Sequence, residues 1–212
     1  PKNGNNGYTW DFSALNFTGI YQGQNAPLIE YESVVVGRSN AAQPNPESGN
    51  HHTKHTIGNS NYTLVDSVFT GYQSVFINGS FSADVISSNG NSNFKVNIIG
   101  DLNVATDYQS INYWSFHYPR SLSFSSEASV DFEVINSAAL KSKIEINGGQ
   151  FVSPVAFVIG PEPYKLKIVE SNGIYKFLVP NAALSDRQKI FVESNADITN
   201  ISALNAVNQN GF

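Results

Sequence analysis

Three of the chain's four histidines lie close together, at His51, His52 and His55. Imidazole nitrogens bind Zn, Cu or Ni, and a loop could bring three of them to one ion. Their neighbours are threonine and lysine, whereas hydrolytic zinc motifs need a helix and a carboxylate base. Two interpretations stay open, a metal site or solvated histidines in a polar loop. We expect no other cofactor.

Paired carboxylates are the next candidates for chemistry. Glu30 with Glu32, and Asp131 with Glu133, share one face of a strand because strand side chains alternate. A glycosidase needs two acids roughly 5 to 10 Å apart across a cleft, but such pairs are also common on solvent-facing strands. The sequence contains no nucleophile elbow, phosphate loop or calcium loop. We therefore expect a protein that is not an enzyme. The alternative is a carbohydrate-active enzyme.

The densest aromatic cluster is the candidate binding surface, and it comprises Tyr113, Trp114, Phe116, His117, Tyr118 and Arg120. Alternation along a strand puts Tyr113 and His117 on one face and Trp114, Phe116 and Tyr118 on the other. Exposed aromatic rings stack on sugars and anchor protein interfaces, where Trp, Tyr and Arg dominate. The second face is either a ligand surface or part of the core.

Four N-glycosylation sequons begin at Asn16, Asn61, Asn78 and Asn200. They are glycan sites only if the protein is archaeal or eukaryotic, in which case they place their loops at the surface.

Composition bounds the class of protein. Of 212 residues, 14% are charged, well below the roughly 25% typical of soluble domains. Asparagine and serine, with 26 residues each, supply the polar surface instead. The net charge of −5 argues against nucleic acid, because binding it requires a basic stripe. No stretch is long and apolar enough to predict a membrane span.

The chain has no cysteine and no methionine. The first absence excludes disulfides and thiolate chemistry, and together they leave few oxidisable side chains, which suits an exposed protein. We expect a processed chain that has lost its export signal and works outside the cell or at its surface.

Short apolar runs with period-2 alternation predict an all-β protein with little or no helix. Asn-Gly pairs between the runs, such as Asn78-Gly79 and Asn172-Gly173, predict turns. The predicted strands are Ser74–Ile77, Phe81–Ile86, Phe94–Ile99, Leu122–Phe124, Val130–Ile135, Lys143–Ile146, Phe151–Ile159, Lys165–Val169, Tyr175–Val179, Lys189–Glu193 and Asp197–Ile201. Two architectures stay open, a β-solenoid or β-helix and an antiparallel β-sandwich.

Two domains are predicted. Residues 1–62 comprise a polar, mobile N-terminal arm (residues 1–7), a β segment, and a long polar loop at Ser39–Ser60. Residues 63–212 form the main all-β domain, and the two could be one continuous domain.

The segment Phe69–Val104 resembles the opening of the head-GIN auto-transporter adhesin family of bacterial envelope proteins. The resemblance rests on Phe69, Tyr72, Val75, Gly79, Val85, Val96, Ile98, Gly100 and Asp101. It implies a β-helical surface protein without known catalysis. In addition, Tyr8–Ser13 resembles the TWDFS strand of secreted multi-domain Bacteroidetes proteins.

The sequence thus predicts a secreted or cell-surface binding module, either an adhesin or an envelope-associated protein. A structural subunit of a filament, fibre or coat is the first alternative, and a carbohydrate-active enzyme is the second. The expected partners are a cell-surface glycan, a protein or identical subunits.

Overall fold

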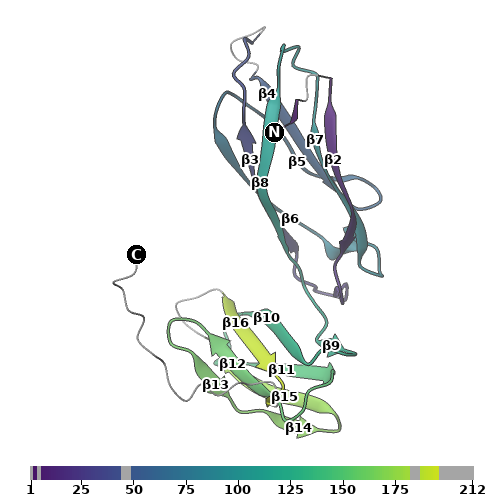
Figure 1. Ribbon diagram of the computed structural model, residues 1–212. Coiled ribbons are helices and arrows are strands. Elements are labelled where there is room, and N and C mark those ends of the chain that lie inside the picture. Colours follow the sequence, from purple (N-terminus) through teal and green to yellow (C-terminus); the bar gives the residue numbers. More distant parts are fainter. Residues whose placement is uncertain (1, 4–5, 44–48, 182–186, 196–212) are drawn as a thin grey trace, which may run out of the picture. The chain divides into compact units, whose positions relative to one another are not determined.

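The computed structural model describes residues 2–3, 6–43, 49–181 and 187–195. The chain divides into two compact units, Pro1–Ser121 and Leu122–Phe212 (Figure 1). Both are built from strands, and the one helical element among the described residues is the 3-10 turn η1 (Ala83–Val85). No helix in the described ranges is long and apolar enough to cross a membrane.

The N-terminal unit has eight strands, which form two four-stranded sheets. They are β1 (Lys2–Asn3), β2 (Tyr8–Asn16), β3 (Ile29–Gly37), β4 (His51–Ile57), β5 (Tyr62–Phe69), β6 (Ser74–Phe81), β7 (Asn91–Ile98) and β8 (Tyr108–His117). One sheet has the order β1-β8-β3-β6 and the other the order β2-β7-β4-β5. All pairs between these strands are antiparallel.

The two sheets of the N-terminal unit enclose one hydrophobic core. Along β3, Ile29, Tyr31 and Val35 are buried, while Glu30 between the first two is exposed. This alternation is what a strand requires when one of its faces packs against a second sheet and the other meets water. Phe94, from β7 in the opposite sheet, is fully buried against the same core.

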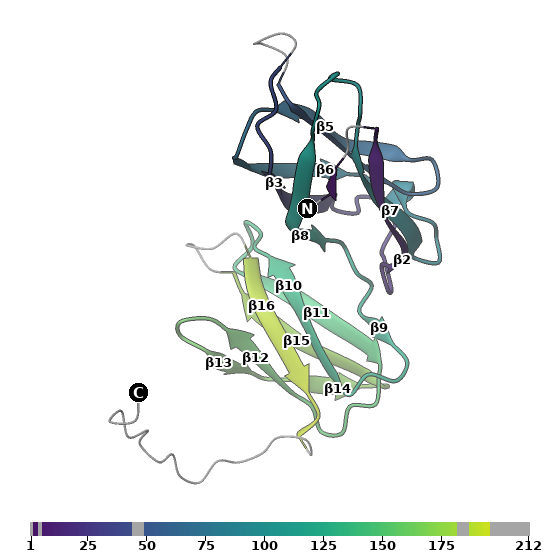
Figure 2. The ribbon, with the colours of Figure 1, turned by 45° about the horizontal axis from the view of Figure 1, so that its top comes forward.

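The C-terminal unit repeats the plan with shorter strands (Figure 2). Its strands are β9 (Ser123–Phe124), β10 (Ser129–Ile135), β11 (Lys141–Gly148), β12 (Val155–Ile159), β13 (Tyr164–Leu166), β14 (Val169–Ser171), β15 (Ile174–Pro180) and β16 (Arg187–Glu193). The sheet orders are β10-β16-β12-β13 and β14-β15-β11-β9. A separate core includes Ile146, Val179 and Ile190.

The all-β prediction is confirmed, and the antiparallel sandwich fits both units. The β-helix, which the head-GIN resemblance also implied, is not formed. A solenoid stacks parallel rungs, whereas the ladders here are antiparallel except for the short pairing of β9 with β11.

The predicted domain boundary after Tyr62 differs from the observed division after Ser121. Strands on both sides of residue 62 pair with one another, β4 with β5 and β3 with β6 and β8. The N-terminal arm is also partly structured, since Lys2 and Asn3 pair with Gln109 and Tyr108.

The two Asn-Gly turn predictions have different outcomes. Asn172 and Gly173 have φ values of 55° and 74°, as a two-residue type I′ hairpin turn between β14 and β15 requires. Asn78-Gly79, in contrast, lies in the middle of β6, which pairs with β3 without interruption.

Two further strand predictions have other outcomes. The predicted strand Phe81–Ile86 is wrong, since Ala83–Val85 form η1 with the Ser82 side chain as its cap. The strand predicted at Asp197–Ile201 lies outside the described residues.

Candidate functional site

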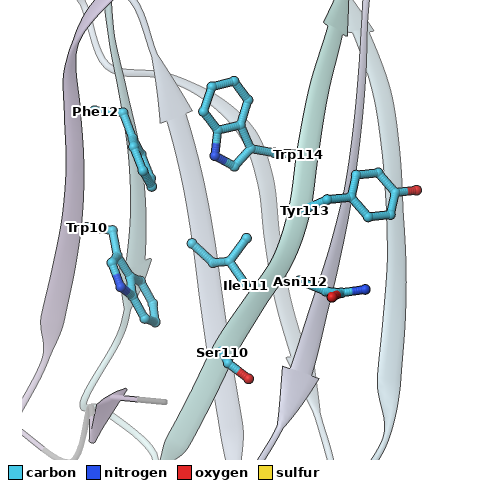
Figure 3. Close-up of a pocket in the computed structure, with 7 residues that line it drawn as sticks. All are labelled: Trp10, Phe12, Ser110, Ile111, Asn112, Tyr113 and Trp114. Carbon is cyan, nitrogen blue, oxygen red and sulfur yellow. The ribbon is translucent and has the colours of Figure 1, made fainter.

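Strand β8 changes the phase of its alternation at a bulge. Tyr113 pairs with Val34 and Ile111 pairs with Val35, so Asn112 is the extra residue. Asn112 and Tyr113 are consecutively exposed, while Ile111 and Trp114 on either side pack toward the core. Figure 3 shows Ile111 and Trp114 pointing toward Trp10 and Phe12, and Asn112 and Tyr113 pointing the other way.

The inward aromatic residues of the candidate surface belong mainly to the core. Phe116 packs on Tyr31 with ring centroids 5.0 Å apart, and Tyr118 packs edge-on to Phe17 at 5.2 Å. Trp114 contacts Phe12 at 5.5 Å. The predicted split into two faces is therefore correct, and Trp114 alone of this inward group also lines a groove.

The remaining candidates lie elsewhere. Tyr113 is exposed, and His117 is exposed opposite Glu30 of β3. Arg120 is half-buried and forms an isolated β-bridge with Ile20. The six predicted residues thus do not form one surface.

The fold creates a groove between the two sheets, on the side of the sandwich where β2 of one sheet lies beside β8 of the other. We call it the β2–β8 groove, and its lining residues are Trp10, Phe12, Ser110, Ile111, Asn112, Tyr113 and Trp114 (Figure 3). Its volume is about 470 Å³, which lies within the range of ligand pockets. The side chains that point into it are aromatic or aliphatic.

Two strand edges border this groove. Among the described residues, strand β2 is the outermost strand of its sheet and pairs only with β7. Strand β8 pairs along its length with β3, and on its other edge the described residues place only β1, opposite Tyr108 and Gln109. On the opposite side of the sandwich, β5 and β6 contact each other.

The histidine cluster lies in β4 and not in a loop, so the predicted polar loop Ser39–Ser60 contains a central strand. Alternation places His51 and His55 on the buried face and His52 on the outer face. The three imidazoles therefore do not converge, and the metal arrangement considered for them is not formed. Among the residues that the structure describes, no group of His, Asp or Glu side chains could hold a metal ion.

His51 ties two loops together at one end of the sandwich. Its Nε2 lies 2.9 Å from the carbonyl oxygen of Ser39, which can only accept, so Nε2 donates. Its Nδ1 lies 2.6 Å from Oδ1 of Asp107, which is 1% exposed and also accepts from Gln109 Nε2. A Cβ on Gly37 would lie 2.7 Å from His51 Nε2, so the ring needs a glycine beside it.

His55 is buried and neutral. Burial lowers its pKa to about 4, and its Nδ1 accepts the hydroxyl of Tyr31 at 2.5 Å. Burial also raises the pKa of Tyr31 far above its usual range, which keeps this hydroxyl protonated and able to donate. Thr53 Oγ1 satisfies the other ring nitrogen at 3.0 Å.

His52 has the opposite environment. Partial burial disfavours its charge, but hydrogen bonds from both ring nitrogens to Asp66 and Asp101, at 2.6 and 2.8 Å, outweigh burial and raise its pKa. The same contact, with Lys54 at 2.9 Å, lowers the pKa of Asp66. These four residues form a charge network on the polar outer face.

The carboxylate pairs do not lie across a cleft. Glu30 and Glu32 sit on the outer face of their sheet. Asp131 pairs with Lys189 at 3.0 Å, and Glu133 with Arg187 at 3.4 Å.

The sequons lie on the surface where the structure describes them. Asn16, Asn61 and Asn78 are exposed, and Asn200 lies outside the described residues. Whether they carry glycans stays a prediction.

Sequence reasoning missed Trp10, Phe12 and Ile111 as site residues. The i, i+2 spacing of Trp10 and Phe12 in the TWDFS segment indicates one apolar strand face. Nothing in the sequence predicts that this face meets β8, because the two strands are distant in the chain.

No family model matches this chain, and no curated protein matches it significantly. The crystal structure of dimeric latent PorU from Porphyromonas gingivalis is similar in fold, with a TM-score of 0.57 and 7% sequence identity. The match covers 92% of this chain and 18% of that one, so this chain spans less than a fifth of its neighbour. At this identity the likeness shows the fold alone.

Proposed function

We propose that the chain is a non-catalytic binding module of a cell-surface or extracellular protein, and that the β2–β8 groove is its binding site. One observation carries this proposal. The chain contains two tryptophans, Trp10 and Trp114, and both line the same open groove.

A groove of this kind is favourable for binding because its walls retain hydrophobic surface that folding has not removed from water. Trp10, Phe12 and Trp114 are only partly buried, although each packs on the core. When a partner covers such rings, more apolar area is removed from water, which contributes about 25 cal/mol per Å² to the free energy of binding. Tryptophan is also prominent among binding hot spots.

The non-catalytic part of the proposal is supported by the titratable groups outside the groove. The buried histidines are satisfied by Asp107, Ser39, Tyr31 and Thr53 and have no access to a substrate. The groove itself is lined by no carboxylate, histidine or lysine.

The surface location is supported by composition, namely the absent cysteine and the scarce charge, which asparagine and serine replace.

Tryptophan emission gives a direct test, because both tryptophans report on the groove. The full chain is screened against a glycan array and a displayed random-peptide library, and each hit is titrated while emission is recorded. We expect hits to shift the emission and Trp10→Gln to weaken them at least tenfold, while Trp10→Phe retains most affinity.

Phe76→Ser is the matched control. Phe76, in β6, is 55% exposed on the outer face of the β1-β8-β3-β6 sheet and does not line the groove. Thermal unfolding establishes that each variant is folded. If no hit shifts the emission, or if Trp10→Gln and Phe76→Ser bind alike, the groove is not the site.

A further inference from the structure

We infer that the occupant of the β2–β8 groove is an extended polypeptide segment of a partner protein, which adds as an antiparallel strand to the edge of β8. This inference rests on the proposed function and specifies the class of ligand and its mode of binding.

The edge of β8 already accepts a strand of this kind. Lys2 and Asn3 of β1 pair antiparallel with Gln109 and Tyr108, at the beginning of β8. Beyond them, no strand among the described residues occupies the outer edge of β8. An added strand would continue a ladder that the fold has begun, with the same orientation.

The bulge defines which part of the edge is usable. Opposite β3, the register of β8 is regular from Tyr113 to His117 and is interrupted at Asn112. A bulge terminates pairing and twists an edge away, so it separates the part taken by β1 from the open part. The added strand therefore has about five residues in the ladder, the length of a typical short strand.

The pleat of the sheet determines which side chains of the partner strand would face the groove. Residues directly opposite in an antiparallel ladder share a face. The partner residue opposite Trp114 would enter the groove, where Phe12 lies 5.5 Å from the Trp114 ring, and so would the residue two positions away. The expected recognition pattern is an apolar residue at alternate positions, with unrestricted residues between.

The polar groups at the groove favour a polypeptide over a sugar. A sugar requires several fixed polar side chains, and besides the indole N–H groups of the two tryptophans and the Tyr113 hydroxyl, which points away, the polar side chains here are Ser110 and Asn112. Ser110 Oγ accepts Arg38 Nε at 2.9 Å, and Asn112 points away from the groove (Figure 3). The hydrogen-bonding capacity at the groove is therefore mainly the backbone edge of β8, which a second backbone matches.

The peptide-binding test uses the unmodified full chain, so its result does not depend on the folding of a variant. Peptides selected from the displayed library are synthesised in two N-methylated forms, each blocking the N–H groups of one set of alternate residues. A strand in a ladder presents one set to its neighbour and the other to water. We expect one form to lose binding at least tenfold and the other to bind like the parent, with apolar residues at alternate positions among the selected sequences.

Other outcomes overturn the inference and separate it from the proposed function. If only glycans bind and shift the tryptophan emission, or if both N-methylated forms bind like the parent, the groove is a binding site but strand addition is wrong. If sedimentation shows the chain dimerising and Trp10→Gln abolishes this, the occupant is a second copy. If neither peptides nor glycans shift the emission, the proposed function fails together with the inference.

Discussion

At the scale of single residues, three histidines of one short strand have three different environments. His51 is held by Asp107, His55 is neutral in the core beside Tyr31, and His52 lies on the surface, where Asp66 and Asp101 raise its pKa. Strand alternation separates them, and burial then lowers the pKa of His55 while nearby carboxylates raise that of His52. The consequence that can be measured is the pH dependence of stability.

We predict that His55 destabilises the N-terminal unit in acid. The unfolded chain takes up a proton near pH 6.5, but the folded chain does so only near pH 4, because burial lowers the pKa of His55. As the pH falls from 6.5 to 4, the free energy of unfolding should decrease by up to about 3 kcal/mol, and His55→Gln should remove most of this decrease. Urea unfolding followed by tryptophan emission measures it, because Trp10 and Trp114 both belong to this unit.

His52→Gln is the matched control, because the pKa of His52 is raised and not lowered. Its stabilisation is complete below pH 6.5 and is lost as the pH rises through the raised pKa, so this variant should differ from the parent in slope only above pH 6.5. A flat profile for the parent between pH 6.5 and 4 would contradict the assignment of His55 as buried and neutral.

At the scale of elements, β8 supplies most of the residues that line the β2–β8 groove. Its bulge sends Asn112 and Tyr113 to the outside in succession and returns Trp114 to the inside. If the same residues, Asn112 included, paired with β3 without a bulge, either Trp114 or Ile111 would lie on the outer face, and the groove would lose one wall.

We predict that deleting Asn112 yields a folded protein with a more adhesive edge. Tyr113 keeps Val34 as its partner and Ile111 keeps Val35, so the inward residues stay inward. The straightened edge loses a feature that discourages edge-to-edge pairing, so self-association should increase. Circular dichroism checks the fold, and sedimentation velocity measures association at matched concentration.

Replacing Asn112 by serine is the control, because it retains the bulge and should leave the protein as associated as the parent. A deletion variant that unfolds, or that associates no more than the serine variant, would show that the bulge has another role.

At the scale of the whole molecule, each unit has its own two sheets and its own core. Hydrophobic burial within each unit is therefore expected to stabilise that unit by itself.

We predict that core damage stays within one unit. Ile57 and Ile190 are 1% and 0% exposed, in the N-terminal and C-terminal cores. Truncating either to alanine should cost about 2 to 5 kcal/mol. Ile57→Ala should shift the urea midpoint seen by tryptophan emission, whereas Ile190→Ala should leave that midpoint unchanged and shift part of the circular dichroism transition.

These two variants are each other's control, since they remove the same atoms from equally buried sites. Equal shifts of the tryptophan midpoint would mean that the units unfold together.

Sequence by itself determined the all-β class and the two faces of the aromatic strand. It also determined the Asn172-Gly173 hairpin, because alternation and turn chemistry are local properties of the backbone. It did not determine that His51–Ile57 is a central strand, since that polar segment is buried only by partners such as Asp107 and Tyr31 from distant parts of the chain. The β2–β8 groove was decided by tertiary structure alone, because it lies between the edges of two sheets whose strands, β2 and β8, are about a hundred residues apart in sequence.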